Sequence, residues 1–286
     1  MNWKIFIITH GPVRDDYYVN DPDFSYDNFV LFNVSDTPIF HSKFSIINAN
    51  EMSGYKTLGK WYAESEVIYN LYICNLYKEL DYIGFVHWDY ELRSFDESIG
   101  YKVCKAISNE INKGTPFISF STFDFEYAYN LNIMLDIDFP NQCYGTEGRN
   151  CFDEILAEYN LFYDKDVLIQ TIFNRQINLC SAFLVNRVVF EDLMPFYKNV
   201  IEKGYLNYFD TNHNYRFQGG MMERYIGIYS AMIDMVTIPL NHHYNHKKEV
   251  TELQLRFEQF RKALFKNIKR LKRVVFFNLL NDTKSF

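Results

Sequence analysis

The stretch DYIGFVHWDYELR, residues 81–93, decides the fold of this 286-residue chain. It contains a compact apolar run, Tyr82–Val86, which is typical of a buried strand. The run ends in His87, Trp88 and Asp89, where a strand would give way to a loop. Side chains two positions apart on an extended chain point the same way. We therefore expect His87 and Asp89 to face together and Trp88 to face the opposite side.

Similar apolar runs alternate with helical patterns on both sides of this stretch, which predicts an α/β fold with right-handed crossovers and a mostly parallel sheet. A loop rich in aromatic residues is expected at 205–217, and Gly219 and Gly220 are expected to open the helix that follows it. The expected strands are 3–8, 29–34, 82–86, 116–121 and 180–186, and the expected helices are 61–80, 97–112, 152–159, 187–203 and 219–233.

The composition is that of a globular protein, with 48% hydrophobic and 23% charged residues. It excludes collagen-like and disordered chains. The net charge of −7 is unevenly distributed, because residues 247–286 carry eleven Lys and Arg against four acidic residues. Residues 1–246 are therefore strongly acidic, which argues against a nucleic-acid partner. We expect one α/β domain over 1–246 and a basic helical extension over 247–286.

The basic extension is predicted to be an amphipathic helix over about 249–280. Such a helix can lie on an anionic membrane, or its apolar face can dock on the protein body or on a second subunit, as in a homodimer. The apolar run Ile5–Ile8 is too short for a signal-peptide core. Five cysteines without a CxxC pair indicate a reducing compartment. The expected location is the cytoplasm, with membrane association on its cytoplasmic face as one option.

Ligands of open α/β sheets bind beyond the carboxyl ends of the strands. There, His87 and Asp89 could hold Mn²⁺ or Mg²⁺ against a diphosphate, and an imidazole ligand favours Mn²⁺. The spacing alone leaves a second interpretation open, in which both side chains only hydrogen-bond the loop backbone.

Four blocks of the chain resemble, in order and spacing, the capsular-polysaccharide-type glycosyltransferases. That family carries a Tyr-x-Glu-x-x-x-x-Tyr helix before a strand ending in His-Tyr-Arg-Arg-Tyr. Tyr62, Glu64 and Tyr69 match the first pattern, and His87 with Tyr90 matches the second. The blocks are WYAESEVIYNLY (61–72), ELDYIGFVHWDYEL (79–92), INLCSAFLVNRVVFEDLMPFY (177–197) and FQGGMMERYIGIYSAM (217–232).

The resemblance implies a GT-A-like fold, with a nucleotide-sugar above the sheet and a DxD motif after a central strand. Here the motif becomes His-Trp-Asp, in which Asp89 keeps the metal-facing carboxylate and His87 replaces the first Asp. The implied function is the transfer of a sugar from a nucleotide-diphosphate donor, with a UDP-sugar favoured, to a glycan or other hydroxyl acceptor. The implied reaction is metal-assisted, with Mn²⁺ or Mg²⁺, and inverting, although retention stays open.

Two functions of other classes also fit the residues. A metal-dependent phosphoesterase or nucleotidyltransferase could use the same Asp and His groups, although the chain has no P-loop. A non-catalytic carbohydrate-binding protein would fit the altered DxD motif.

Glu223 is the candidate catalytic residue. We expect it in the first turn of the helix at 219–233, where the helix dipole favours the ionised carboxylate that a general base needs. The resemblance implies an acidic base at the start of the corresponding helix. The alternative is that Glu223 only complements the dipole or pairs with Arg224 or Arg216.

The remaining candidates lie near the two ends of the domain. Three histidines fall within residues 242–246, and we choose His243 and His246 as metal ligands, although His-rich tracts also bind metals nonspecifically. Thr9 and His10 follow the first strand, where the GT-A-like fold implied by the resemblance receives the nucleoside. Ordinary capping of the loop backbone is the alternative for this pair.

Overall fold

A computed structural model describes residues 1–11, 13, 25–59, 62–88, 90–91, 103–130, 151–204 and 217–242. The chain divides into two units, Met1–His242 and His243–Phe286, and the whole second unit lies outside the described residues. The basic helix expected at 249–280 and nearly all of the loop expected at 205–217 also fall outside them. No helix in the described part is long and apolar enough to cross a membrane.

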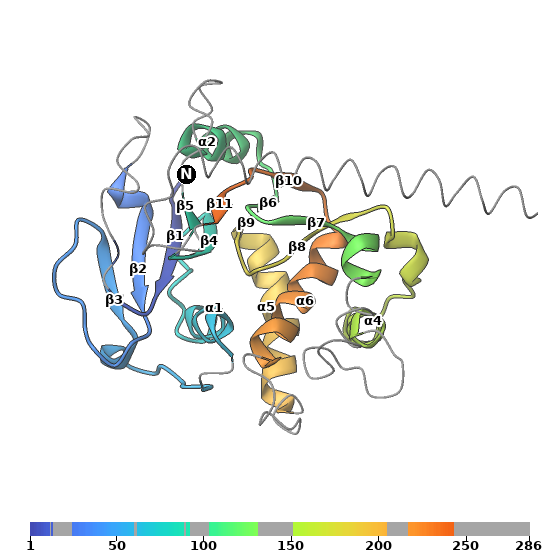
Figure 1. The fold of residues 1–286 in the computed structure, drawn as a ribbon, viewed down its shortest axis with the longest axis horizontal. Helices are drawn as coiled ribbons and strands as arrows, with labels where there is room; N and C mark the ends of the chain where they lie inside the picture. The colour runs from blue at the N-terminus through green and yellow to red at the C-terminus, as the bar shows by residue number, and fades with distance from the viewer. Residues whose placement is uncertain are drawn as a thin grey trace, which may run out of the picture. The chain divides into compact units, whose positions relative to one another are not determined.

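The centre of the fold is a seven-stranded sheet in the order β10-β6-β9-β4-β1-β2-β3 (Figure 1). All neighbouring strands run parallel except β9, which is antiparallel to both β4 and β6. The mostly parallel α/β fold expected from the sequence is therefore confirmed. The strands are β1 (Trp3–Thr9), β2 (Phe29–Asn33), β3 (Ser45–Asn48), β4 (Tyr82–His87), β6 (Phe117–Ser119), β9 (Phe183–Asn186) and β10 (Met235–Thr237).

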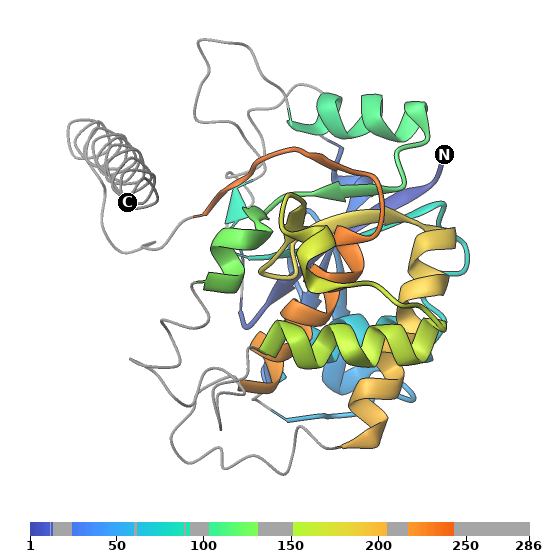
Figure 2. The ribbon, with the colours of Figure 1, turned by 90° about the vertical axis from the view of Figure 1, so that its right-hand side faces the viewer.

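Helices cover both faces of this sheet. One face packs against α2, and the other packs against α1, α5 and α6 (Figure 1). Helix α4 lies against α6 on the outside of that second layer (Figure 2). The helices are α1 (Glu64–Ile73), α2 (Val103–Lys113), α4 (Cys151–Tyr163), α5 (Arg187–Lys203) and α6 (Phe217–Ala231), with short 3₁₀ turns at Tyr26–Asn28, Ala49–Glu51 and Ile169–Ile172.

Two small antiparallel sheets lie beside the main one. Strand β5 (Tyr90–Glu91) pairs with β11 (Asn241–His242), and β7 (Thr122–Asp124) pairs with β8 (Gln176–Asn178). The first pair joins the segment after β4 to the last described residues of the chain.

Gly84, in the middle of β4, is closely surrounded by side chains of the neighbouring strands. A Cβ atom at this position would lie 2.8 Å from Cδ1 of Leu184 on β9 and 2.9 Å from Cγ1 of Ile5 on β1. Both distances are shorter than van der Waals contact, so the close packing of side chains around β4 requires a glycine here.

Several expected elements differ in extent. The helix predicted for 61–80 is present only over Glu64–Ile73, because Asn75 takes a positive φ of 59° and the chain continues in turns. Helix α6 begins at Phe217, two residues before its predicted start at Gly219. Strands β3 and β10, at the two edges of the main sheet, have no counterpart among the expected strands, because neither is a continuously buried run.

Candidate functional site

The carboxyl ends of β1 and β4 are where a ligand of this sheet is expected to bind. The two strands are parallel neighbours, and the chain leaves β1 for β2 on one side while it leaves β4 for β6 on the other. Such a switch in strand order is where open α/β sheets bind their ligands. His87 ends β4, and the exposed His10 follows β1 directly. Their ring centroids lie 6.4 Å apart, so the fold brings these two predicted site residues together.

A carboxylate contacts one of the two imidazoles at this edge. Oε1 of Glu64, the first residue of α1, lies 2.8 Å from Nε2 of His87. The Glu64 side chain is 8% exposed and the His87 side chain 17%. From the sequence, Glu64 is recognisable only as part of the Tyr-x-Glu-x-x-x-x-Tyr motif. Its partner could not be identified there, because helix α1 and the end of β4 meet only in the folded chain.

The turn that leads into α1 is strained. The amide of Ser65 donates to the carbonyl of Tyr62 at 3.0 Å, and Ala63 between them has φ 49° and ψ −130°. These angles suit the first central residue of a type II′ turn, a position that normally belongs to glycine. A non-glycine residue in such a sparsely populated region costs on the order of 1–3 kcal/mol. The backbone is therefore strained at Ala63, immediately before Glu64.

The second acidic residue of α1, Glu66, contacts the loop before the helix. Glu66 accepts a hydrogen bond from the Tyr55 hydroxyl at 2.6 Å and from the amides of Leu58 and Gly59 at 2.7 Å and 3.0 Å. These contacts fasten the preceding loop to the helix. Tyr69, the last residue of the motif, donates its hydroxyl to Glu202 on α5 at 3.0 Å and so ties the two helices together.

Buried Tyr197 on α5 lies between the helices that carry Glu64 and Glu223, because α1, α5 and α6 contact one another. Burial is the main cause that raises the pKa of Tyr197. Its hydrogen bond with Ser65 lowers the pKa, and the negative charges of Glu223 and Glu64 raise it. That Glu223 shares a site with the Glu64–His87 pair stays a prediction.

The position of Glu223 on its helix differs from the prediction. Because α6 begins at Phe217, Glu223 lies in the second helical turn, where the dipole of the helix N-terminus has largely faded. Two residues that follow Glu223 along α6 pack on β8. Ser230 accepts a hydrogen bond from the amide of Asn178 at 2.8 Å, and Gly227 allows the carbonyl of Asn178 to approach. Glu223 itself is half-buried, and its role as a base stays a prediction.

Thr9 shapes the loop after β1. Its side chain is buried, and its hydroxyl donates to the carbonyl of Gly11 at 2.5 Å and accepts from the amide of Gly11 at 3.2 Å. This is the backbone capping that the sequence left open as an alternative. Contacts of Thr9 or His10 with a nucleoside stay predictions.

The first histidine of the late tract pairs with the strand that follows β4. In the β5–β11 pair, His242 lies opposite Tyr90, the residue directly after Asp89. Asp89, His243 and His246 themselves lie outside the described residues. Among the residues that the structure does describe, no three His, Cys, Asp or Glu side chains come together as a potential metal site.

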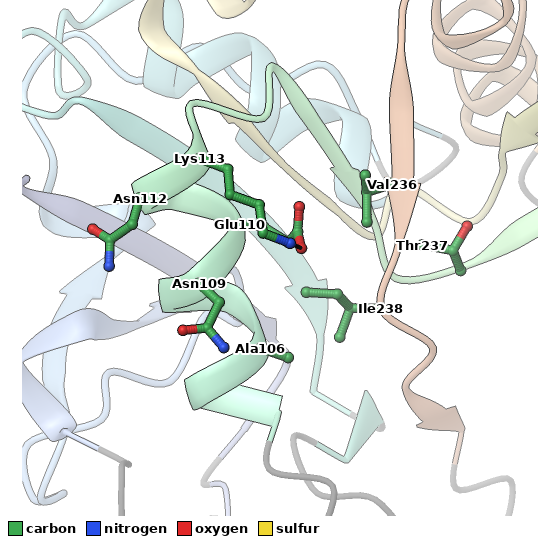
Figure 3. A pocket seen from close by; sticks show the side chains of 8 residues that line it. All are labelled: Ala106, Asn109, Glu110, Asn112, Lys113, Val236, Thr237 and Ile238. Atoms are coloured by element: carbon green, nitrogen blue, oxygen red, sulfur yellow. Dashed lines mark hydrogen bonds and ion pairs between the residues drawn. The ribbon is translucent and has the colours of Figure 1, made fainter.

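A separate pocket of about 330 Å³ lies between α2 and the edge strand β10 (Figure 3). Lys113 and Glu110 extend into it from α2, and Ile238 points toward the helix from the other side (Figure 3). Glu110 accepts hydrogen bonds from Lys113 at 2.6 Å and Thr115 at 2.7 Å, which lower the pKa of its carboxyl. Its charge is thus balanced within the wall of the pocket, and the wall includes none of the predicted site residues.

The chain matches no family model and no curated protein sequence. Its structure is similar to that of the bifunctional glycosyltransferase WbbM in its apo form, with a TM-score of 0.52 and 15% identity. The match covers 86% of this chain and 46% of the WbbM chain, so the present chain spans less than half of that protein. A second similar structure is mouse xyloside xylosyltransferase 1, at TM-score 0.37 and 11% identity, covering 84% and 86% of the two chains. The fold is a mixed α/β fold of the GT-A-like type.

Proposed function

We propose that this protein is a glycosyltransferase that moves a sugar from a nucleotide-diphosphate donor to a hydroxyl of a glycan or another acceptor. One observation carries the proposal. His10, His87 and Glu64 gather at the carboxyl ends of β1 and β4 of a GT-A-like sheet.

The two imidazoles are suited to the donor diphosphate. An imidazole can donate a hydrogen bond to a phosphate oxygen and carries positive charge when protonated. The donor therefore lies across the ends of β1 and β4, with its diphosphate at His87 and its nucleoside toward Thr9 and His10. We favour a UDP-sugar as the donor.

Glu223 serves as the general base. A carboxylate within reach of the acceptor hydroxyl accepts its proton while the oxygen attacks the anomeric carbon. The bond from that carbon to the diphosphate breaks, and the nucleoside diphosphate leaves. Attack on the side opposite to the leaving group inverts the configuration. Glu223 is half-buried and lies on a different helix from Glu64, so the two carboxylates can serve different parts of the substrate pair.

A divalent cation fits the donor set only in part. Imidazole and carboxylate groups suit Mn²⁺, and Mg²⁺ is the alternative, but the described residues alone do not form a site. We propose that His87, Asp89, His243 and His246 would hold the ion. The bound ion would supply positive charge against the departing diphosphate.

The basic C-terminal segment extends the proposal beyond the catalytic domain. Its eleven Lys and Arg suit binding to the cytoplasmic face of an anionic membrane. Docking on a second copy of the chain is the alternative. Liposome flotation of the full chain, with and without anionic lipid, tests the first choice.

A thermal-shift panel tests the donor site. The protein is heated with UDP, GDP, CDP or thymidine diphosphate, each with and without Mn²⁺. A ligand that binds only the folded state raises the unfolding temperature. We expect one nucleoside diphosphate to raise it, and Mn²⁺ to enlarge the shift. The absence of a shift for every nucleotide in both conditions would contradict the proposal.

A further inference from the structure

We propose that Glu64 is a positioning residue, which fixes the ring of His87 at the edge of the sheet where the diphosphate of the donor is proposed to bind. The proposal rests on the function proposed above and names the residue that organises its phosphate site. It starts from the 2.8 Å contact between Oε1 of Glu64 and Nε2 of His87.

The contact removes the freedom of the imidazole ring. His87 is the last residue of β4, and its backbone is fixed in the sheet by its pairing with Ile8. An ionised carboxylate only accepts hydrogen bonds, so Nε2 carries the proton in this contact. With the backbone fixed at one end and Nε2 at the other, rotation of the ring is blocked. A histidine whose first nitrogen donates to a carboxylate presents the second one in a set direction.

The surroundings make this contact strong. Both side chains are largely buried, and a hydrogen bond to a charged group gains strength where water is excluded. The ring centroids of His10 and Trp88 lie 6.4 Å and 6.0 Å from the ring centroid of His87. The fixed ring therefore lies at the edge of the sheet where the ends of β1 and β4 meet.

The strained turn before Glu64 is a second, independent observation. Ala63 takes φ 49° and ψ −130° at the N-cap of α1, and its conformation sets where the first residue of the helix begins. Strained backbone persists where the surrounding structure over-determines it and gathers at functional sites. Glu66, two residues later, is saturated by three contacts to its own loop, whereas Glu64 reaches across to a different element. Of these two neighbouring acids, Glu64 is the one placed for function.

Calorimetric titration with UDP or GDP, whichever the wild-type protein binds more tightly, tests the proposal in the presence of MnCl₂. We expect Glu64→Ala and His87→Ala each to weaken binding about tenfold, a change of roughly 1.4 kcal/mol. The double variant should bind no more weakly than the weaker single variant, because both changes remove one unit. Glu64→Gln should stay within about threefold of the wild type, since the amide oxygen can still accept from Nε2.

Glu202→Ala is the matched control. Glu202 contacts α1 through Tyr69 and has no part in the phosphate site, so its removal should leave the affinity unchanged. Wild-type affinity in Glu64→Ala would overturn the proposal, and so would additive losses in the double variant.

Nitrogen-15 NMR of the histidine rings separates this proposal from the proposed function. In the ligand-free wild type, we expect His87 to carry its proton on Nε2, and Glu64→Ala to change the ring nitrogen shifts of His87. If the protein binds no nucleoside diphosphate, the proposed function is wrong. The ring nitrogen shifts of His87 then still test whether Glu64 positions the ring. Unchanged His87 shifts in Glu64→Ala would overturn this positioning role.

Discussion

Ala63 stands in a left-handed backbone conformation directly before Glu64, the residue whose carboxylate contacts His87. Glycine adopts this conformation without a steric penalty, whereas alanine is strained there. We expect Ala63→Gly to raise the free energy of unfolding by about 1 kcal/mol, once the greater flexibility of glycine in the unfolded chain is allowed for. Urea denaturation measures the change.

Ala157→Gly on the exposed side of α4 is the control for this prediction. A glycine inside a helix should lower the free energy of unfolding by about 1 kcal/mol. If both substitutions lower the stability by similar amounts, the turn before Glu64 is not strained.

Gly84→Ala should destabilise the central sheet. The new methyl group would meet side chains of Leu184 and Ile5 at distances below 3.0 Å. Overpacking of this kind typically costs about 1–3 kcal/mol, which a thermal or urea unfolding curve detects. Gly11→Ala is the comparison, because a Cβ atom there meets nothing within 4 Å. Equal stability of both variants would contradict the packing described around β4.

Glu223→Gln should remove sugar transfer while the donor still binds. The amide keeps the shape of the side chain but cannot accept a proton, so the rate should fall by roughly 10²–10⁴-fold. Initial rates of acceptor glycosylation and calorimetric affinity for the nucleoside diphosphate separate the two effects. Glu110→Gln, in the pocket beside β10, provides a carboxylate control outside the proposed site. Transfer at the wild-type rate in Glu223→Gln would remove Glu223 from the mechanism.

The protein should lose stability between about pH 10 and pH 12. Burial is the main cause that raises the pKa of Tyr69 to about 12, and its hydrogen bond to Glu202 adds to the effect; Tyr129, bonded to Asp153, also rises to about 12. Their ordinary pKa is 10.0. The unfolded chain therefore gives up these protons first, and the stability present below pH 10 declines as the pH rises.

Urea midpoints measured at pH 9, 10, 11 and 12 check this direction. Tyr69→Phe cannot ionise at this position, so its stability should depend less steeply on pH in this range. A wild-type midpoint that rises from pH 10 to pH 12 would contradict the burial of these hydroxyls.

The sheet was largely predictable because its inner strands are continuous apolar runs. Trp3–Thr9, Phe29–Asn33 and Tyr82–His87 are buried on both faces and need no tertiary information to be recognised. The short edge strands were harder, since Ser45–Asn48 and Met235–Thr237 are half-exposed and carry no apolar alternation. Their place is set by pairing with β2 and β6.

The candidate site was predictable only where it follows a strand. His87 and His10 could be placed because the ends of neighbouring parallel strands meet at one edge. Glu64 could not, since its contact depends on how α1 docks against the sheet. The start of α6 was misplaced because Gly219 and Gly220 suggested a helix boundary. In the fold Gly219 is buried within the helix, where packing outweighs the low helix propensity of glycine.

Product analysis by mass spectrometry tests the central claim most directly. Wild-type protein and His87→Ala are incubated with a panel of UDP- and GDP-sugars, glycan acceptors and Mn²⁺. The account predicts a glycosylated acceptor together with free nucleoside diphosphate for the wild type, and a strongly reduced yield for His87→Ala. Release of phosphate or pyrophosphate without sugar transfer, no product with any donor, or an undiminished yield from His87→Ala would contradict it.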